Sequence, residues 1–204
     1  MSEDERAARW DRRHAEASVE SAEPARVLVD YAHLLPDGGI ALDLACGLGG
    51  NAVFLAEQGF KTFAWDLSSV AVDKVATWSR DNLLSITAEA HDAVAAPPEP
   101  ERFDVVVVSR FLERSLAGPL AHCLRPGGLL FYQTFTRSRV HGERGPSDDA
   151  YRLADNELLR LFSALQVLAY RDEDRVGDLG QGFRDEALLV ARRPEDGSAP
   201  EDSP

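Results

Sequence analysis

Short apolar runs recur along the middle of the chain, and each one reads as a strand. The first five runs cover residues 40–44, 61–65, 86–90, 104–109 and 129–135. The fourth is almost continuously apolar between its terminal residues, which is typical of a parallel strand covered on both faces. The pattern therefore predicts a largely parallel sheet buried between layers of helices.

Helical patterns separate these runs. Residues 52–56 read as a helix, and Gly59 can end it in a left-handed conformation. After the second run, Ser68 or Ser69 can cap another helix. The apolar positions of that helix recur at helical spacing: Val72, Val75 and Ala76. This alternation of strands and helices predicts a doubly wound sheet with right-handed crossovers.

The C-terminal third has a different pattern. Asp155 can cap a helix whose apolar stripe is Leu158, Leu161, Phe162 and Leu165. Strands at 167–170 and 187–191 follow, joined by a polar loop with no helical pattern, so we expect them to be antiparallel. The predicted fold is an α/β, Rossmann-like, doubly wound and mostly parallel seven-stranded sheet, with helices on both faces and an antiparallel C-terminal strand pair.

The 204 residues suit one domain with a single core. We predict a flexible N-terminal tail at 1–9, a domain at 10–193 and a disordered C-terminal tail at 194–204, because both ends are polar and the middle has no linker.

The net charge of -13 narrows the possible partners. An acidic surface repels phosphate backbones, so we expect no nucleic-acid partner. The first residues lack the apolar stretch of a signal peptide, and no apolar run is long enough for a membrane span. We therefore expect a cytoplasmic protein without a membrane partner. Cys46 and Cys123 have no closely spaced Cys or His partners, which predicts buried thiols and no metal site.

The candidate chemistry begins where the first strand ends. Asp43 lies in that strand, and Gly47 and Gly49 follow before a helix. Glycines permit a sharp turn and close approach to a ligand, and the helix N-terminus offers free amides. Asp66 ends the second strand 19 residues after Gly47. A carboxylate at that point can accept hydrogen bonds from the ribose of an adenine cofactor.

This loop alone leaves several alternatives open. With Ala52 in the last place, it satisfies the dinucleotide fingerprint of an NAD(P)-dependent oxidoreductase, and it also suits a purely structural turn. Two acids separate these alternatives: Asp43 inside the strand, where a dehydrogenase usually has an apolar residue, and Asp92 after the third strand. The chain also has no obvious Tyr-x-x-x-Lys pair for hydride transfer.

Taken in order, these motifs resemble the class I methyltransferase family over residues 10–193. The motifs are 42–49 for the loop, 66–68 after the second strand, 91–92 after the third, 103–105 entering the fourth and 124–128 before the fifth. Within that class, residues 46–51, 10–13 and 157–162 look like the tellurite-resistance methyltransferase group.

The resemblance implies S-adenosylmethionine as cofactor and S-adenosylhomocysteine as product. Asp43 and the amides near Gly47 and Gly49 would face its methionine part, while Asp66 would hold the ribose. The full cofactor-binding set is Asp43, Ala45, Cys46, Gly47, Gly49, Asn51, Asp66, Leu67, Asp92, Ala93 and Ser109. In this family the N-terminal segment often folds over the cofactor, so three residues would either belong to a lid or serve packing alone: Trp10, Arg12 and Arg13.

We expect a small-molecule acceptor, either an oxyanion or a thiol, methylated by in-line transfer. The candidate catalytic residues are Arg110, Arg137 and His141, and Arg139 and Arg144 would complete an anion-attracting rim beyond the fourth and fifth strands. Two alternatives stay open here: a solvated loop whose charges pair with nearby acids, and a non-catalytic protein that binds the cofactor and regulates a partner.

Overall fold

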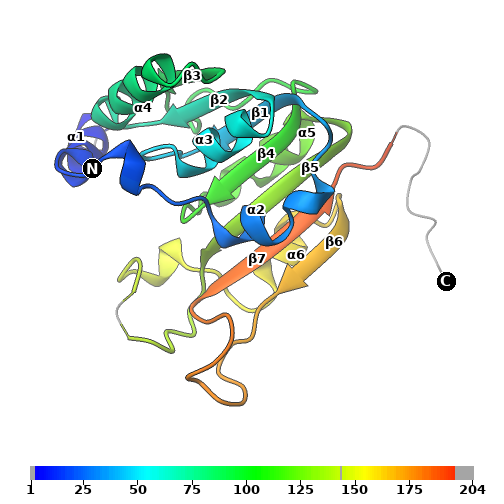
Figure 1. Ribbon diagram of the computed structural model, residues 1–204. Coiled ribbons are helices and arrows are strands. Elements are labelled where there is room, and N and C mark those ends of the chain that lie inside the picture. Colours follow the sequence, from blue (N-terminus) through cyan, green and yellow to red (C-terminus); the bar gives the residue numbers. More distant parts are fainter. Residues whose placement is uncertain (1–2, 143, 196–204) are drawn as a thin grey trace.

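A single seven-stranded sheet organises the molecule (Figure 1). The computed structural model describes residues 3–142 and 144–195. The strand order is β3-β2-β1-β4-β5-β7-β6. The strands are β1 Gly39–Leu44, β2 Phe60–Asp66, β3 Ile86–Ala90, β4 Phe103–Ser109, β5 Leu124–Phe135, β6 Gln166–Arg171 and β7 Glu186–Arg192.

The first five strands run parallel, and β7 alone runs in the opposite direction, between β5 and β6. β1 pairs in parallel with β2 and β4, and β7 lies antiparallel between β5 and β6. Because β7 is antiparallel, its first residue, Glu186, pairs with Phe135 at the end of β5. The residues just before β7 therefore lie at the carboxyl edge of the parallel strands, where ligands bind in sheets of this kind.

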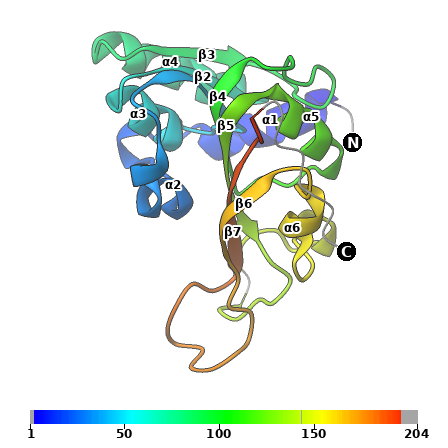
Figure 2. The same cartoon turned by 90° about the vertical axis from the view of Figure 1, so that its right-hand side faces the viewer.

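Helices cover both faces of the sheet (Figure 2). They are α1 Glu3–His14, α2 Arg26–Asp30, α3 Gly50–Glu57, α4 Ser69–Asp81, α5 Ala117–Cys123 and α6 Glu157–Leu161. On one face, Val27 of α2 and Leu55 of α3 share a core with the middle strands. On the other face, Leu120 of α5 and Leu158 of α6 do the same. The predicted fold class is confirmed.

Two local predictions, the cap of α4 and the glycine that ends α3, are also confirmed. Ser68 caps α4, since its hydroxyl accepts a hydrogen bond from the backbone N of Ala71 at 3.2 Å. Gly59 follows the end of α3 with a φ of 91°. No helix among residues 3–142 and 144–195 is long and apolar enough to cross a membrane.

Three local predictions differ from the structure. Residues 3–9, expected to form a flexible tail, belong to α1. The N-cap of α6 is Asn156 rather than Asp155, and it adopts a left-handed conformation without a side-chain cap. β5 begins at Leu124, earlier than expected, because Leu124 pairs with Phe103 before an irregularity in the ladder. Of the predicted C-terminal tail, residues 196–204 lie outside the described part of the chain.

Candidate functional site

Glycines fold the loop between β1 and α3. Gly47 and Gly49 have φ values of 52° and 76°, a region that favours glycine. A Cβ on Gly49 would lie 2.9 Å from Cγ2 of Val75 on α4. At Gly50 a Cβ would lie 2.5 Å from the carbonyl oxygen of Glu23. Glycine therefore allows this loop to pack against α4 and against the segment before α2.

A buried hydrogen-bond network holds the start of α3 against β1 and β4. Asp43 is fully buried, and its two carboxylate oxygens accept from Asn51 Nδ2 and from the backbone N of Ala52, each at 3.1 Å. Asn51 Nδ2 also donates to Ser109 Oγ at 3.1 Å. Oδ1 of Asn51 accepts from the backbone N of Ala25 at 2.7 Å. Both oxygens of Asp43 are thus engaged within the protein.

The environment of this network shifts the pKa values of two groups. Burial raises the pKa of Asp43 to about 7; the hydrogen bonds from Asn51 and Ala52 oppose this shift, and the nearby charge of Asp66 adds to it. Burial also raises the pKa of the Cys46 thiol well above its ordinary value. A thiol with a raised pKa is poorly ionised, so Cys46 is ill suited to act as a nucleophile.

Asp66 links the end of β2 to the glycine loop. Its Oδ2 accepts from the backbone N of Gly47, and its Oδ1 accepts from the backbone N of Ser68, each at 2.8 Å. Leu67, the next residue, is half-buried. Each carboxylate oxygen has two acceptor sites, so the Asp66 side chain retains capacity for further donors.

Asp92 lies after β3 and is engaged on both oxygens. Oδ1 accepts from the backbone N of Val94 at 2.9 Å, and Oδ2 forms an ion pair with Nη2 of Arg6 at 3.0 Å. Ala93 is buried beside it. The partner of Asp92 comes from α1, far away in the sequence.

The helix α1 lies against α4, close to the glycine loop (Figure 1). Asp11 accepts from Ser68 Oγ at 2.7 Å and from the backbone N of Val70 at 3.2 Å. His14 is the neighbour of Gly47, because a Cβ on that glycine would lie 3.3 Å from its Cε1. Nζ of Lys74 donates to the carbonyl oxygens of residues 14, 15 and 17. These contacts hold the C-terminal part of the helix.

Of the residues of the predicted lid, Trp10 and Arg13 contact one another within α1. Trp10 is 39% exposed, stacks on His14 with ring centroids 6.0 Å apart and lies under the guanidinium of Arg13. Arg12 is exposed. Arg6 and Asp11 make the contacts to the site instead. Burial lowers the pKa of His14, partly offset by Asp66.

A second polar network lies beyond β4 and β5. The backbone N of Arg110 donates to the carbonyl oxygen of Gln133 at 2.8 Å. Gln133 Oε1 accepts from the backbone N of Val27 at 2.8 Å, and its Nε2 donates to Glu186. Nε of Arg110 lies 3.6 Å from Oε1 of Glu186. Since Arg110 follows Ser109 directly, the two networks meet at the end of β4.

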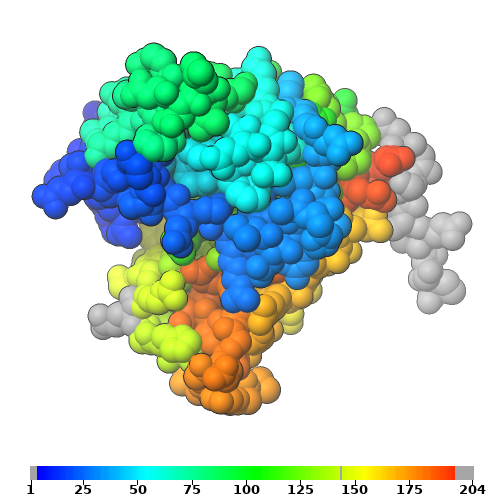
Figure 3. All heavy atoms as spheres, in the orientation of Figure 1, coloured from blue at the N-terminus to red at the C-terminus, as the bar shows by residue number. Residues whose placement is uncertain are grey.

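The predicted acceptor-side residues differ in their partners and in their exposure. Arg139 is paired with Asp149 at 2.6 Å, as expected for a loop whose charges pair with nearby acids. His141 is paired with Asp185. Arg137 is exposed. Burial raises the pKa of Glu157, but the hydrogen bond from Arg114 lowers it on balance, and the charge of Arg137 adds a smaller effect in the same direction. Arg144 is exposed as well. In the space-filling view, the surface is hollowed between the dark blue N-terminal segment and the yellow-green segment after β5 (Figure 3).

Sequence reasoning missed Arg6, Asp11, Gln133, Asp185 and Glu186. A signal existed for the last two: the predicted antiparallel direction of the final strand places residues before 187 at the carboxyl edge. A signal existed for α1 as well, since residues 3–14 contain neither glycine nor proline.

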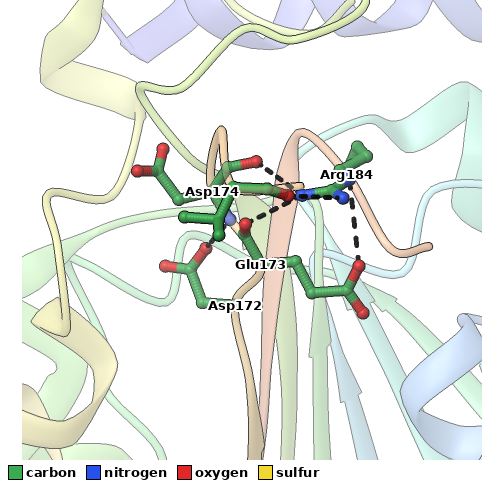
Figure 4. A pocket seen from close by; sticks show the side chains of 5 residues that line it. Asp172, Glu173, Asp174 and Arg184 are labelled. Atoms are coloured by element: carbon green, nitrogen blue, oxygen red, sulfur yellow. Dashed lines mark hydrogen bonds and ion pairs between the residues drawn. The ribbon is translucent and has the colours of Figure 1, made fainter. Parts of the chain in front are cut away.

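A further hollow lies in the loop between β6 and β7 (Figure 4). Arg184 lines this hollow, and its guanidinium donates to the carbonyl oxygens of Glu173, Asp174, Val176 and Asp178. This arginine organises its own loop. Within the described ranges, no cluster of three or more His, Cys, Asp or Glu side chains could hold a metal ion.

The comparisons with known proteins agree with this geometry. Residues 10–173 match a family model described as a methyltransferase domain. No curated protein sequence matches the chain. Solved structures share its fold, and at the identities below 25% described next the likeness concerns the fold alone.

Three similar structures illustrate the likeness. One is described as "Conversion of a Disulfide Bond into a Thioacetal Group during Echinomycin Biosynthesis"; it is 21% identical, with a TM-score of 0.70, over 95% of this chain and 94% of that chain. TehB from Haemophilus influenzae is 21% identical, with a TM-score of 0.69, over 85% of this chain and 64% of that chain. An S-adenosylmethionine-dependent methyltransferase from Mesorhizobium loti is 18% identical, with a TM-score of 0.64, over 86% and 100%.

Proposed function

This chain belongs to the methyltransferase-domain family, and on that premise we propose that it methylates a small molecule by in-line transfer at the carboxyl edge of its sheet. It is a methyl-transferring enzyme, and its cofactor is S-adenosylmethionine. The sequence-based expectation of both is confirmed. The family match leaves the nicotinamide-dependent alternative without support. One observation carries the proposal: the glycine loop, Asp66 and the end of β4 meet at one edge of the sheet.

The residues at this edge suit the cofactor. The glycine loop carries no side chain at Gly47 or Gly49. Each carboxylate oxygen of Asp66 accepts one hydrogen bond from a backbone N–H and retains a second acceptor site for a ribose hydroxyl. We assign Asp66 to the ribose. We assign the backbone of the glycine loop, with Ala45 and Cys46, to the methionine part. The hydrophobic side chain of Leu67 and the pair Asp92 and Ala93 would flank the adenine.

Asp43 and Asn51 have a different part in this proposal. Both belong to the buried network, so they position the loop and Ser109 rather than offer free atoms to a ligand. Displacement at a methyl group depends on near-attack geometry, and holding that geometry can lower the barrier by about 7–11 kcal/mol. A rigid network between the loop and the end of β4 serves this purpose.

The acceptor would lie beyond β4 and β5, beside Arg110. Figure 3 shows a hollowed surface on this side of the molecule, and the acidic surface argues against a nucleic-acid substrate. An oxyanion or a thiol is the acceptor class that the tellurite-resistance resemblance favours. TehB is one structural neighbour among many, since 1014 solved chains match. A fold that so many proteins share does not identify the methyl acceptor.

Methyl transfer is tested with S-adenosylmethionine that carries a trideuterated methyl group. The enzyme is incubated with a mixture of small oxyanions, thiols and phenols, and mass spectrometry detects the acceptor that gains the label. We expect transfer by the native protein and none by Asp66→Ala. Cofactor binding without transfer to any acceptor would favour the non-catalytic alternative.

Arg137 tests the acceptor side once an acceptor is known. We expect Arg137→Ala to raise the acceptor KM about tenfold by removing one charge-assisted contact. The affinity for S-adenosylmethionine should stay unchanged. Arg160→Ala, another exposed arginine, is the matched control. Identical kinetics for the native protein and Arg137→Ala would remove this residue from the site.

A further inference from the structure

A buried aspartate holds the imidazole of His141. Asp185 is 2% exposed, and its Oδ2 lies 2.9 Å from Nδ1 of His141. The backbone N of His141 lies 3.2 Å from each carboxylate oxygen, and the backbone N of Val140 also donates to Oδ1. The carboxylate therefore receives several N–H groups from one short segment, and it fixes both the backbone and the ring of His141.

These donors keep Asp185 ionised. Burial alone would raise its pKa, but the hydrogen bonds from His141 and Val140 outweigh burial, and the net pKa lies below the ordinary value. An ionised carboxylate only accepts hydrogen bonds, so the proton of this pair is on Nδ1 of the ring. In a neutral imidazole with a proton on Nδ1, the lone pair is on Nε2. The His141 side chain is 48% exposed, which leaves that nitrogen open to a ligand.

The pair lies at the edge where the acceptor is proposed to bind. Asp185 directly precedes β7, and its carbonyl oxygen accepts from the backbone N of Thr136, just after β5. The next residue, Glu186, contacts Arg110 at the end of β4 at 3.6 Å. His141 itself lies in the segment that follows β5. The imidazole is thus held beyond β5, the neighbour of β4, whose end carries Ser109 and Arg110.

Resting on the proposed function, we infer that His141 is the general base of the reaction, with Asp185 as its positioning residue, and that the acceptor is a small molecule whose nucleophilic atom carries a proton. As the nucleophile forms its bond to the methyl carbon, the carbon–sulfur bond breaks and its electron pair stays on sulfur. The acceptor proton moves to Nε2 of His141. An acceptor that is already ionised would not require this pair.

The first test determines which ring nitrogen of His141 carries the proton. Nitrogen-15 NMR of the histidine side chains, with His141→Gln to assign the signal, should show the proton of the neutral ring on Nδ1. In Asp185→Asn this preference should be lost, because an amide both donates and accepts. A proton on Nε2 in the native protein would overturn the inference.

The second test compares two acceptors that differ in ionisation: a phenol, which keeps its proton at neutral pH, and 4-nitrothiophenol, which is a thiolate. For the phenol, we expect His141→Gln and Asp185→Asn to lower kcat by about 10²–10⁴-fold, with little change in KM. For the thiolate, we expect turnover to stay near the native rate. Equal losses for both acceptors, or methylation of the thiolate alone by the native protein, would overturn the inference.

Failure of this inference is distinct from failure of the proposed function. If His141→Gln methylates the phenol as fast as the native protein does, only the general base is wrong. If the native protein methylates neither acceptor, the NMR result still decides whether the ring is held as a base. If the native protein fails to bind S-adenosylmethionine, the proposed function itself is wrong.

Discussion

At the scale of single residues, the carboxylates of this edge differ in their partners. Asp43 is fully buried and bonded only within the protein, whereas Asp66 keeps acceptor sites beside the glycine loop. Asp185 is held by N–H groups of the segment after β5. The same functional group therefore has three roles: one aspartate holds the loop, one is assigned to the ribose and one positions a histidine.

Asp43 should give the folded protein a distinctive dependence on pH. Because its pKa rises from 3.8 to about 7 on folding, the folded state binds more protons than the unfolded state between these values. The contribution of Asp43 to the free energy of unfolding should therefore fall as the pH rises through this window. Urea denaturation of the native protein and of Asp43→Asn, from pH 4 to 7.5, isolates this contribution.

In Asp43→Asn, one N–H donor of Asn51 or Ala52 would face the NH₂ group of the new amide. This lost hydrogen bond should lower the free energy of unfolding by about 1–3 kcal/mol. The difference in free energy of unfolding between the native protein and Asp43→Asn should be largest near pH 4 and should decrease toward pH 7. A loss that is constant or that grows with pH would show that the pKa of Asp43 is not raised.

At the scale of elements, the start of α3 depends on close backbone packing. A Cβ at Gly50 would lie 2.5 Å from the carbonyl oxygen of Glu23, and backbone cannot move aside as a flexible side chain can. We expect Gly50→Ala to destabilise the protein by about 1–3 kcal/mol through overpacking. Thermal unfolding measures this change.

Gly118→Ala is the matched control for Gly50→Ala. Gly118 lies in α5, and a Cβ there would meet no atom within 4 Å. Alanine should therefore stabilise this helix by about 0.5–1 kcal/mol. Equal effects at both positions would contradict the packing of the loop against the segment before α2.

The helix α1 should slow the release of the product. Asp11 ties it to the N-terminus of α4 through Ser68 and Val70. Removing these charge-assisted bonds with Asp11→Ala should loosen the helix, because such bonds contribute about 1.5–3 kcal/mol. We expect S-adenosylhomocysteine to dissociate about tenfold faster, or more, as measured by stopped-flow fluorescence. Asp4→Ala, an exposed acid on the same helix, should leave the rate unchanged.

At the scale of the whole molecule, the sequence predicts the sheet better than the site. Apolar runs and turn residues predict all seven strands. The signal is strongest for an inner strand such as β4, because burial on both faces requires a continuous apolar sequence. The helix α1 escapes prediction because its side chains are nearly all polar. Its docking depends on individual bonds, such as Arg6 to Asp92, that no periodicity reveals.

The acceptor side shows the same difference. Arg137, Arg139 and His141 lie close together in sequence, but only the structure shows that Arg139 pairs with Asp149 and His141 with Asp185. Asp185 is 44 residues from its histidine. Contacts across such a separation depend on how β5 and β7 pair, so sequence spacing cannot predict them.

The most direct test of cofactor use is calorimetric titration with S-adenosylmethionine, S-adenosylhomocysteine and NADPH. The two sulfur cofactors should bind the native protein and NADPH should not. Asp66→Ala should weaken both by about 100-fold or more, through the loss of the hydrogen bonds from the ribose. Circular dichroism confirms that this variant is folded. Binding of NADPH alone, or undiminished binding of S-adenosylmethionine to Asp66→Ala, would contradict the account.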